Sequence, residues 1–220
     1  MSENTTIAVI GGTGAEGSGL ALRWAHAGHR VIIGSRDQAK AQTAADELNA
    51  ILGKPSVEGK SSEDAVDHAQ VVVLTVPYAA QLSTVEELIK KLDGKILVDV
   101  TVPLVPPKVS TVQLPESDSA AVALQAKVGP SVRVVSAFQN ISAHKLKKLD
   151  HTMPCDVLVC SDDKDARLLV VGLAQDAGLR GINAGPLSNS TVAESLTSVL
   201  IWINRTYKVQ DAGIVITGIK

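Results

Sequence analysis

Three glycines near the start of the chain separate an apolar, β-branched run from a helix-like stretch. The run covers residues 7–10, and the glycines are Gly12, Gly14 and Gly17. In a Gly-x-Gly-x-x-Gly turn, one glycine makes the tight turn, the next lets a pyrophosphate approach the backbone, and the last lets the helix pack on the sheet. A second apolar strand at residues 30–33 follows at the distance this unit requires. The spacing predicts a dinucleotide-binding site.

The residues after the second strand indicate which dinucleotide is bound. An NAD site usually carries an acidic residue there to bind the ribose 2′-hydroxyl. This chain instead has Gly34, Ser35 and Arg36, with Lys40 one helical turn later, while Asp37 is placed to cap the next helix. A hydroxyl and two cations would bind a 2′-phosphate, so the pattern favours NADP. The alternative is that Arg36 and Lys40 are solvated charges at a helix start.

Two further strands end in polar and proline-containing runs. Thr75, Val76 and Pro77 end the strand at 70–76, and residues 99–103 end the next one. Ligands of open α/β sheets bind at the carboxyl ends of the strands, so both runs are candidate ligand contacts. The simpler reading is that the prolines terminate strands, and both readings can hold together.

The elements that position these residues alternate between strand and helix. This order predicts a Rossmann-type, doubly wound, mostly parallel α/β sheet with a small C-terminal α/β extension and a long C-terminal helix. We divide it into a dinucleotide-binding region, 1–130, and a smaller region, 131–220, that completes the sheet. The expected strands are 7–10, 30–33, 56–60, 70–76, 95–100, 132–137, 157–160 and 181–184, and the expected helices are 15–27, 37–52, one opening at 61, 79–92, 119–127, 164–177 and 188–207.

Composition excludes several classes of function. The chain has 220 residues with 45% hydrophobic and 20% charged content, as in ordinary globular domains. A net charge of −2 and 2% aromatic residues argue against a nucleic-acid partner. No apolar run is long enough to span a membrane, and no secretory signal is visible. Cys155 and Cys160 would point to opposite faces of one strand, which predicts free thiols in a cytoplasmic protein.

The C-terminal helix is apolar on more than one side. Val192, Leu196, Val199, Leu200, Ile203 and Tyr207 form one stripe at helical spacing, with Ile201 opposite and Trp202 on a flank. One sheet face cannot cover this much apolar surface. We therefore expect a second burial partner, either a ligand or another subunit of a homodimer formed through this helix.

No catalytic constellation is apparent. The five histidines are scattered, no nucleophile elbow or Tyr-x-x-x-Lys pair is present, and no ligand spacing for a metal occurs. An alcohol dehydrogenase needs a general base, whereas hydride transfer between two redox cofactors needs only stacked rings at near-attack distance. We therefore predict no catalytic side chain and no metal.

Three segments together resemble the NADPH-dependent coenzyme F420 reductases, and the likeness covers nearly the whole chain. They are residues 10–17 with 34–40, Val-Val-Ser-Ala-Phe-Gln-Asn-Ile-Ser-Ala at 134–143, and 176–180 running into Ala-Gly-Pro-Leu-Ser-Asn-Ser at 184–190 and Glu-Ser-Leu-Thr at 194–197. The resemblance implies an oxidoreductase that transfers a hydride between NADP(H) and the 5-deazaflavin of coenzyme F420, and a homodimer.

The resemblance also implies roles for single residues. Thr13, like Ser35, Arg36 and Lys40, would bind NADP, and the turn at Gln139, Asn140 and Ile141 would face the deazaflavin. Many relatives are expected to have His where this chain has Gln139. Two rival functions are an NADPH-dependent ferric or flavin reductase, which shares the Gly-Pro-Leu-Ser-like segment, and a non-catalytic NADP-sensing module.

Overall fold

Six parallel strands form the central sheet of the computed structural model, which describes residues 4–219. The strand order is β3-β2-β1-β4-β5-β6, and every neighbouring pair is parallel. The chain winds outward in both directions from the gap between β1 and β4, which confirms the doubly wound prediction. The strands are β1 (Thr6–Ile10), β2 (Arg30–Ser35), β3 (Val57–Ser61), β4 (Val71–Leu74), β5 (Ile96–Asp99) and β6 (Arg133–Ser136).

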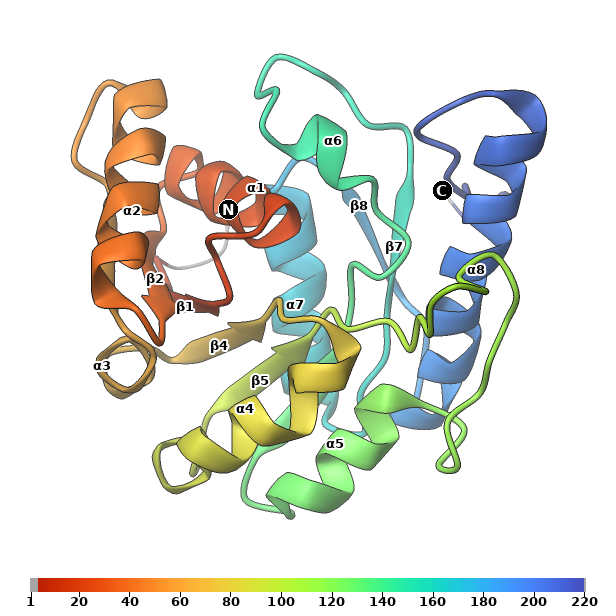
Figure 1. Cartoon of the computed structure of the whole chain (residues 1–220), viewed down its shortest axis with the longest axis horizontal. Coiled ribbons are helices and arrows are strands. Elements are labelled where there is room, and N and C mark those ends of the chain that lie inside the picture. The colour runs from red at the N-terminus through yellow and green to blue at the C-terminus, as the bar shows by residue number, and fades with distance from the viewer. Residues whose placement is uncertain (1–3, 220) are drawn as a thin grey trace.

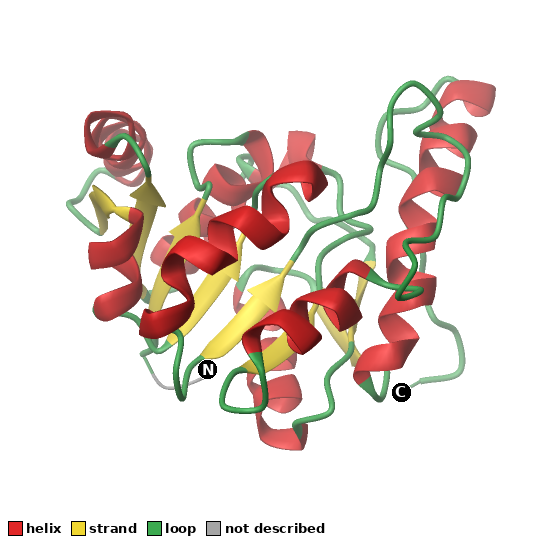
Figure 2. Ribbon diagram, turned by 60° about the horizontal axis from the view of Figure 1, so that its bottom comes forward, coloured by secondary structure: helices red, strands yellow, loops and turns green. Residues whose placement is uncertain are grey.

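Helices cover both faces of this sheet (Figure 2). They are α1 (Ala15–His26), α2 (Gln38–Leu52), α3 (Ser62–Asp67), α4 (Gln81–Leu88), α5 (Ala120–Val128), α6 (Ala143–Leu146), α7 (Lys164–Asp176) and α8 (Ser190–Tyr207), with short 3-10 turns η1 (Tyr78–Ala80), η2 (Ile89–Lys91) and η3 (Leu187–Asn189). Alternate residues of each strand point to opposite faces, so Ile7 and Val9 join the core under α1 and α7, while Ala8 and Ile10 join the core under α3 and α4. The helix expected at 79–92 is present as three consecutive segments: the 3-10 turn η1, the α-helix α4 and the 3-10 turn η2.

A second, two-stranded parallel sheet lies beyond β6. It contains β7 (Asp156–Val159) and β8 (Arg180–Asn183), which flank α7 in sequence. An antiparallel bridge between Ser136 and Cys160 joins it to the edge of β6. This is the predicted C-terminal extension. Cys155 and Cys160 are free, but the expectation that both lie within one strand is wrong, because β7 begins after Cys155.

The proposed division at residue 130 falls within a shared sheet. β6 comes from the second region and pairs with β5 of the first. The division therefore remains a prediction about which region binds which ligand. Residues 1–3 and 220 of the two regions lie outside the described residues. Among residues 4–219, no helix combines the length and apolar character needed to cross a membrane.

The buried face of α8 differs from the expected one. Ala193, Glu194 and Ser198 are buried, whereas Val192 and Val199 of the apolar stripe are 66% and 44% exposed. Tyr207, at the end of the stripe, is 73% exposed, and Ile201 is half-buried rather than free on the far side. Within the same stripe Leu200 is buried and Leu196 and Ile203 are half-buried, so the stripe is divided between the inner and outer sides of a helix that polar contacts hold in place.

Arg23 is a buried cation that ties three parts of the chain together. It lies on α1, is 5% exposed, and among the described residues has no carboxylate partner. Its guanidinium donates instead to backbone carbonyl oxygens, namely those of Lys145, Leu146, Lys148, His151 and Ala177, at 2.7–3.3 Å. Burial lowers the pKa of Arg23. The carbonyl dipoles take the place of a counter-ion, so α6, the segment after it and the end of α7 are fixed to α1.

Replacing this cation should destabilise the fold strongly. Arg23→Ala leaves five carbonyl oxygens without their donor, which we expect to lower the free energy of unfolding by about 3 kcal/mol or more. The measurement is urea unfolding followed by circular dichroism. Arg30→Ala is the control, because Arg30 pairs with Glu58 on the exposed surface and should contribute about 0–1 kcal/mol. Equal losses in the two variants would contradict the role given to Arg23.

Candidate functional site

The predicted site residues lie along one edge of the sheet, where its strands end (Figure 1). Parallel strands bring their carboxyl ends to the same edge, so the loop after β1, residues 75–77 after β4, and the turn after β6 line up across it. The contacts are direct at the switch point between β1 and β4. Both the backbone N–H and the hydroxyl of Thr75 donate to the carbonyl oxygen of Ile10, at 2.8 and 2.9 Å.

The glycines of the first loop are required for two different reasons. A Cβ on Gly17 would lie 2.4 Å from the Thr75 hydroxyl, so the protein itself demands glycine there. A Cβ on Gly14 would meet nothing closer than 3.5 Å, and Gly14 has an ordinary φ of −76°. Glycine at this exposed position leaves open space rather than relieving a clash. Gly14 is also the N-cap of α1 and supplies no side-chain acceptor, so the first N–H groups of α1 are free to bind an anion.

Gly11 was not singled out in the sequence, yet it is equally constrained. Its φ is +80°, and a Cβ there would lie 2.8 Å from the carbonyl oxygen of Thr75. The Gly-Gly pair at 11–12 was the available signal. Gly12 is also tightly placed, since its Cβ would lie 2.9 Å from the carbonyl oxygen of Val9, whereas Thr13 is exposed beside the loop.

A cluster of polar groups follows β2. The Ser35 hydroxyl accepts the N–H of Asp37 at 3.2 Å. As expected, Asp37 caps α2, accepting the N–H groups of Ala39 and Lys40. The guanidinium of Arg36 is exposed, and the ammonium of Lys40 makes a 3.7 Å surface contact with Asp37. The carboxylate is therefore engaged at the helix end, while a hydroxyl and two cations are presented to solvent.

The turn after β6 is held by its side chains. Gln139 donates to the Asp99 carbonyl oxygen at 2.8 Å and to the Ser136 hydroxyl at 2.9 Å, and Asn140 donates to the Asp156 carbonyl oxygen at 2.7 Å. Both amides are 4% exposed, and Oε1 of Gln139 and Oδ1 of Asn140 have no hydrogen-bond partner. Such unpaired buried acceptors are uncommon in proteins, and each of these two oxygens can still accept one hydrogen bond.

A cavity of about 230 Å³ lies beside this turn. Its walls are residues 139–144, the inner side of α8 with Thr197, Leu200, Ile201 and Asn204, and residues Gln210 and Ala212 after α8. The Thr197 hydroxyl donates to the carbonyl oxygen of Gln139 at 2.8 Å and so attaches α8 to the turn. The structure therefore brings Gln139, Asn140 and Ile141 together against the C-terminal helix.

Glu194 fixes the position of α8, and sequence reasoning missed this role. It is 1% exposed, and its carboxylate accepts the Ser119 hydroxyl and the N–H groups of Ala120 and Ala121 at 2.8–3.1 Å. It therefore caps α5 from another helix. Burial raises the pKa of Glu194, while these hydrogen bonds oppose the increase. The signal was the one carboxylate of a largely apolar helix.

Two more carboxyl groups lie at the same sheet edge: Asp99, which belongs to the candidate run 99–103, and Glu16, whose role was missed. Asp99 is fully buried at the end of β5 and accepts from Gln81 and the N–H of Thr101. Burial raises the pKa of Asp99 to about 7, and burial together with the charge of Asp99 raises the pKa of Glu16, in the first turn of α1, to about 8. Both shifts favour the neutral carboxyl form, which would repel an anion bound at the loop less than a carboxylate does. The signal for Asp99 was an acid at the end of an apolar strand.

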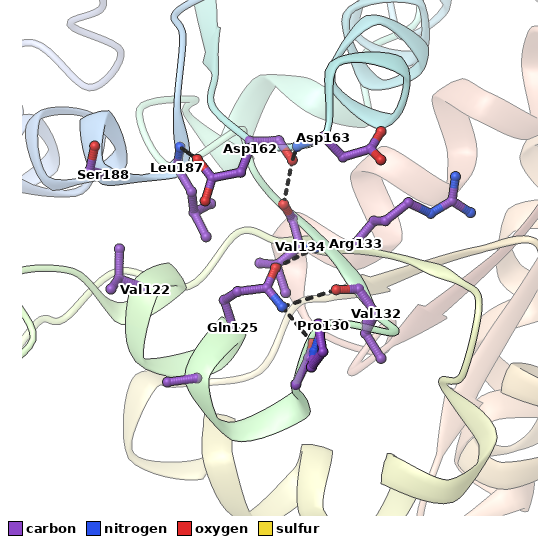
Figure 3. A pocket seen from close by; sticks show the side chains of 13 residues that line it. Val122, Gln125, Pro130, Val132, Arg133, Val134, Asp162, Asp163, Leu187 and Ser188 are labelled. Carbon is purple, nitrogen blue, oxygen red and sulfur yellow. Dashed lines mark hydrogen bonds between the residues drawn. The ribbon is translucent and has the colours of Figure 1, made fainter.

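A groove of about 830 Å³ lies elsewhere (Figure 3). Val122 and Gln125 of α5, the start of β6, Asp162 and Ser188 line it. Its polar groups largely satisfy each other, since Gln125 bonds three backbone groups and Asp162 accepts the N–H of Leu187. None of the predicted site residues lines this groove. Within residues 4–219, no cluster of three His, Cys, Asp or Glu side chains is arranged to hold a metal ion.

Known proteins resemble this chain over nearly its full length. The family described as "NADP oxidoreductase coenzyme F420-dependent" matches residues 6–103. The F420-dependent NADP reductase of Methanocaldococcus jannaschii is 40% identical, covering 97% of this chain and 99% of that protein. The enzyme of the same name from Methanothermobacter thermautotrophicus is 43% identical over 97% of this chain and 95% of its own.

A solved structure agrees with these relatives. It comes from Arthrobacter sp. FB24, is provisionally described as an F420-dependent NADP reductase, and matches with a TM-score of 0.80 at 26% identity, covering 97% of this chain and 99% of that one. Identity of 40% or more with full-length relatives extends the match well past the nucleotide loop, through the turn after β6 and α8. The chain belongs to the family of coenzyme F420-dependent NADP oxidoreductases.

Proposed function

We propose that this protein transfers a hydride directly between NADP(H) and coenzyme F420. The observation that carries the proposal is that two ligand-accepting features share one sheet edge in a chain whose full-length relatives are F420-dependent NADP reductases. One is the loop at Gly14, with its open space and free helix N–H groups, and the other is the cavity beside Gln139.

NADP would bind along the first three strands of the site. The pyrophosphate sits against Gly12, Thr13, Gly14 and Gly17 and the start of α1, and the 2′-phosphate sits with Ser35, Arg36 and Lys40. Thr75, Val76 and Pro77, which adjoin the loop, line the path from the pyrophosphate toward the nicotinamide. These assignments place the dinucleotide largely in the region 1–130.

The deazaflavin would bind in the region 131–220. Gln139, Asn140 and Ile141 line the cavity, where the two amides would hydrogen-bond the polar edge of the deazaflavin ring and Ile141 would add an apolar contact. Gln139 replaces the histidine expected in many relatives, and its own side chain is already held by Asp99 and Ser136. It can bind the ring without titrating.

The chemistry requires little from the protein. Reduction of the deazaflavin by NADPH moves one hydride to carbon 5 of the ring and takes one proton from solvent, so no side chain needs to act as an obligatory acid or base. The side chains bind and orient the two rings and limit water around them. Sites for two redox ligands, rather than one, favour this function over an NADP sensor, and the full-length relatives favour it over a ferric or flavin reductase.

We also propose a homodimer formed through α8. Its outer face exposes three apolar side chains, Val192, Val199 and Trp202, at 44–66%. The loop between β5 and α5 exposes three more: Val105, Val112 and Leu114. Arg205 on α8 donates to Ser110, which attaches that loop to the helix. A second copy would bury this apolar surface around a twofold axis. The free thiols fit an enzyme of the cytoplasm.

Loss of one phosphate contact should be specific to NADPH. We expect Arg36→Ala to raise the KM for NADPH roughly 10- to 100-fold, the effect of one charge-assisted hydrogen bond, and to leave the KM for NADH nearly unchanged. Arg30→Ala, at the opposite end of the same strand, is the control and should change neither. Steady-state kinetics with both nucleotides test this, and an equal rise with both would refute the assignment of Arg36.

If the hydride passes directly from NADPH to the deazaflavin, a deuterium label on NADPH should be retained in the product. With NADPH deuterated at the transferable position of nicotinamide carbon 4, we expect deuterium at carbon 5 of the reduced deazaflavin without exchange into water. Mass spectrometry of the product measures this, and the loss of visible deazaflavin absorbance measures turnover. Extensive washout would indicate a different route, and turnover with free flavin alone would favour the rival flavin reductase.

Charge on the outer face of α8 should separate the subunits. Val199→Asp and Trp202→Asp place carboxylates on the proposed interface, and we expect both variants to be monomers by light scattering. Ile51→Asp is the matched control, because Ile51 is 53% exposed on α2, at the opposite end of the molecule (Figure 1). A wild-type protein that is itself a monomer at micromolar concentration would disprove the proposal.

A further inference from the structure

A basic segment follows the turn that forms the cavity. Residues 144–151 contain one acidic residue, Asp150, and five lysine or histidine residues: His144, Lys145, Lys147, Lys148 and His151. Lys145 forms an ion pair with Asp211. Lys147 and Lys148 are exposed and form no ion pair with any residue from 4 to 219. The function proposed above gives these two ammonium groups no role.

The segment is held in place rather than loosely attached. Arg23 binds four of its carbonyl oxygens from the side of α1. Leu146 packs so closely on α1 that a Cβ on Gly19 would lie 2.4 Å from the Cβ of Leu146. The buried side of the segment is therefore committed to α1, and Lys147 and Lys148 project on the side that remains exposed. Two cations are presented on a fixed backbone.

The segment leads away from the cavity beside Gln139. The side chain of His144 lines this cavity, and Lys145 lines an adjoining one of about 70 Å³. The N–H groups of residues 145, 148 and 151 each bond to the carbonyl oxygen three residues earlier, so the segment is folded as a series of tight turns. Lys147 lies three residues beyond His144, and Lys148 lies three residues beyond Lys145. Both lysines therefore follow the cavity-lining residues closely along a compact stretch of chain, and both are exposed.

We propose that Lys147 and Lys148 bind the anionic tail of the deazaflavin co-substrate, which carries a phosphodiester and carboxylates, where it leaves the cavity. This inference rests on the proposed function. A cavity of about 230 Å³ is smaller than the 300–1,000 Å³ typical for drug-sized ligands, so it accommodates a ring system and leaves a long tail outside. The unpaired ammonium groups supply the complementary charge at that exit.

The test compares the whole coenzyme with its tail-free chromophore, the ribityl deazaflavin that lacks phosphate and carboxylates. Dissociation constants come from quenching of deazaflavin fluorescence, without turnover. For the double variant Lys147→Gln/Lys148→Gln we expect the dissociation constant of the whole coenzyme to rise roughly 3- to 10-fold at low salt, and the difference to shrink in 1 M salt. The dissociation constant of the tail-free chromophore should not change.

The control variant Lys54→Gln/Lys90→Gln removes two exposed lysines far from the cavity and should change neither constant. An unchanged constant for the whole coenzyme, or an equal rise for both ligands, would overturn the inference. Failure of the proposed function has a different signature. In that case the wild-type protein neither binds the two deazaflavins nor reduces them with NADPH, whatever the lysine variants do.

Discussion

The guanidinium of Arg23 is a positive charge buried where α1, the end of α7 and the segment after the Gln139 turn meet. No described carboxylate neutralises it, so its cost of burial is offset by the five carbonyl oxygens around it. Four of those oxygens belong to residues 145–151, a stretch of backbone with little regular structure of its own, since α6 has only four residues. The position of this segment therefore depends on one side chain of α1. The segment in turn forms part of the wall of the cavity beside Gln139.

The same sheet edge is connected to α8 by polar contacts. Glu194 holds the helix on the first turn of α5, and one turn later Thr197 holds the carbonyl oxygen of Gln139. Gln139 in turn bonds to Asp99 at the end of β5. Directional hydrogen bonds thus place α8 over the cavity beside Gln139. They fix the rotation of the helix about its own axis more closely than apolar packing does. This explains why Val192 and Val199 of its apolar stripe are left exposed while Leu200 is buried.

Local patterns were sufficient for much of the fold. The glycine loop, the Asp37 cap and the alternation of strand and helix depend on residues close in sequence, and each was predicted. Arg23 and Glu194 could not be predicted, because their partners are more than 70 residues away and a charged residue in a helix normally indicates a solvent-facing side. The inward face of α8 was mistaken for the same reason. Short α6 gave no periodic signal at all.

The cap of α5 has a consequence for the order in which the protein is made. Ser119 and Glu194 are 75 residues apart, so the first N–H groups of α5 wait for an acceptor until most of the remaining chain has been synthesised. At about 5–20 residues per second, that interval is about 4–15 s. During this time the growing chain can pair β1 to β5 while the beginning of α5 stays open to water. The nucleotide half can thus form on the ribosome well before the helix that encloses the second ligand.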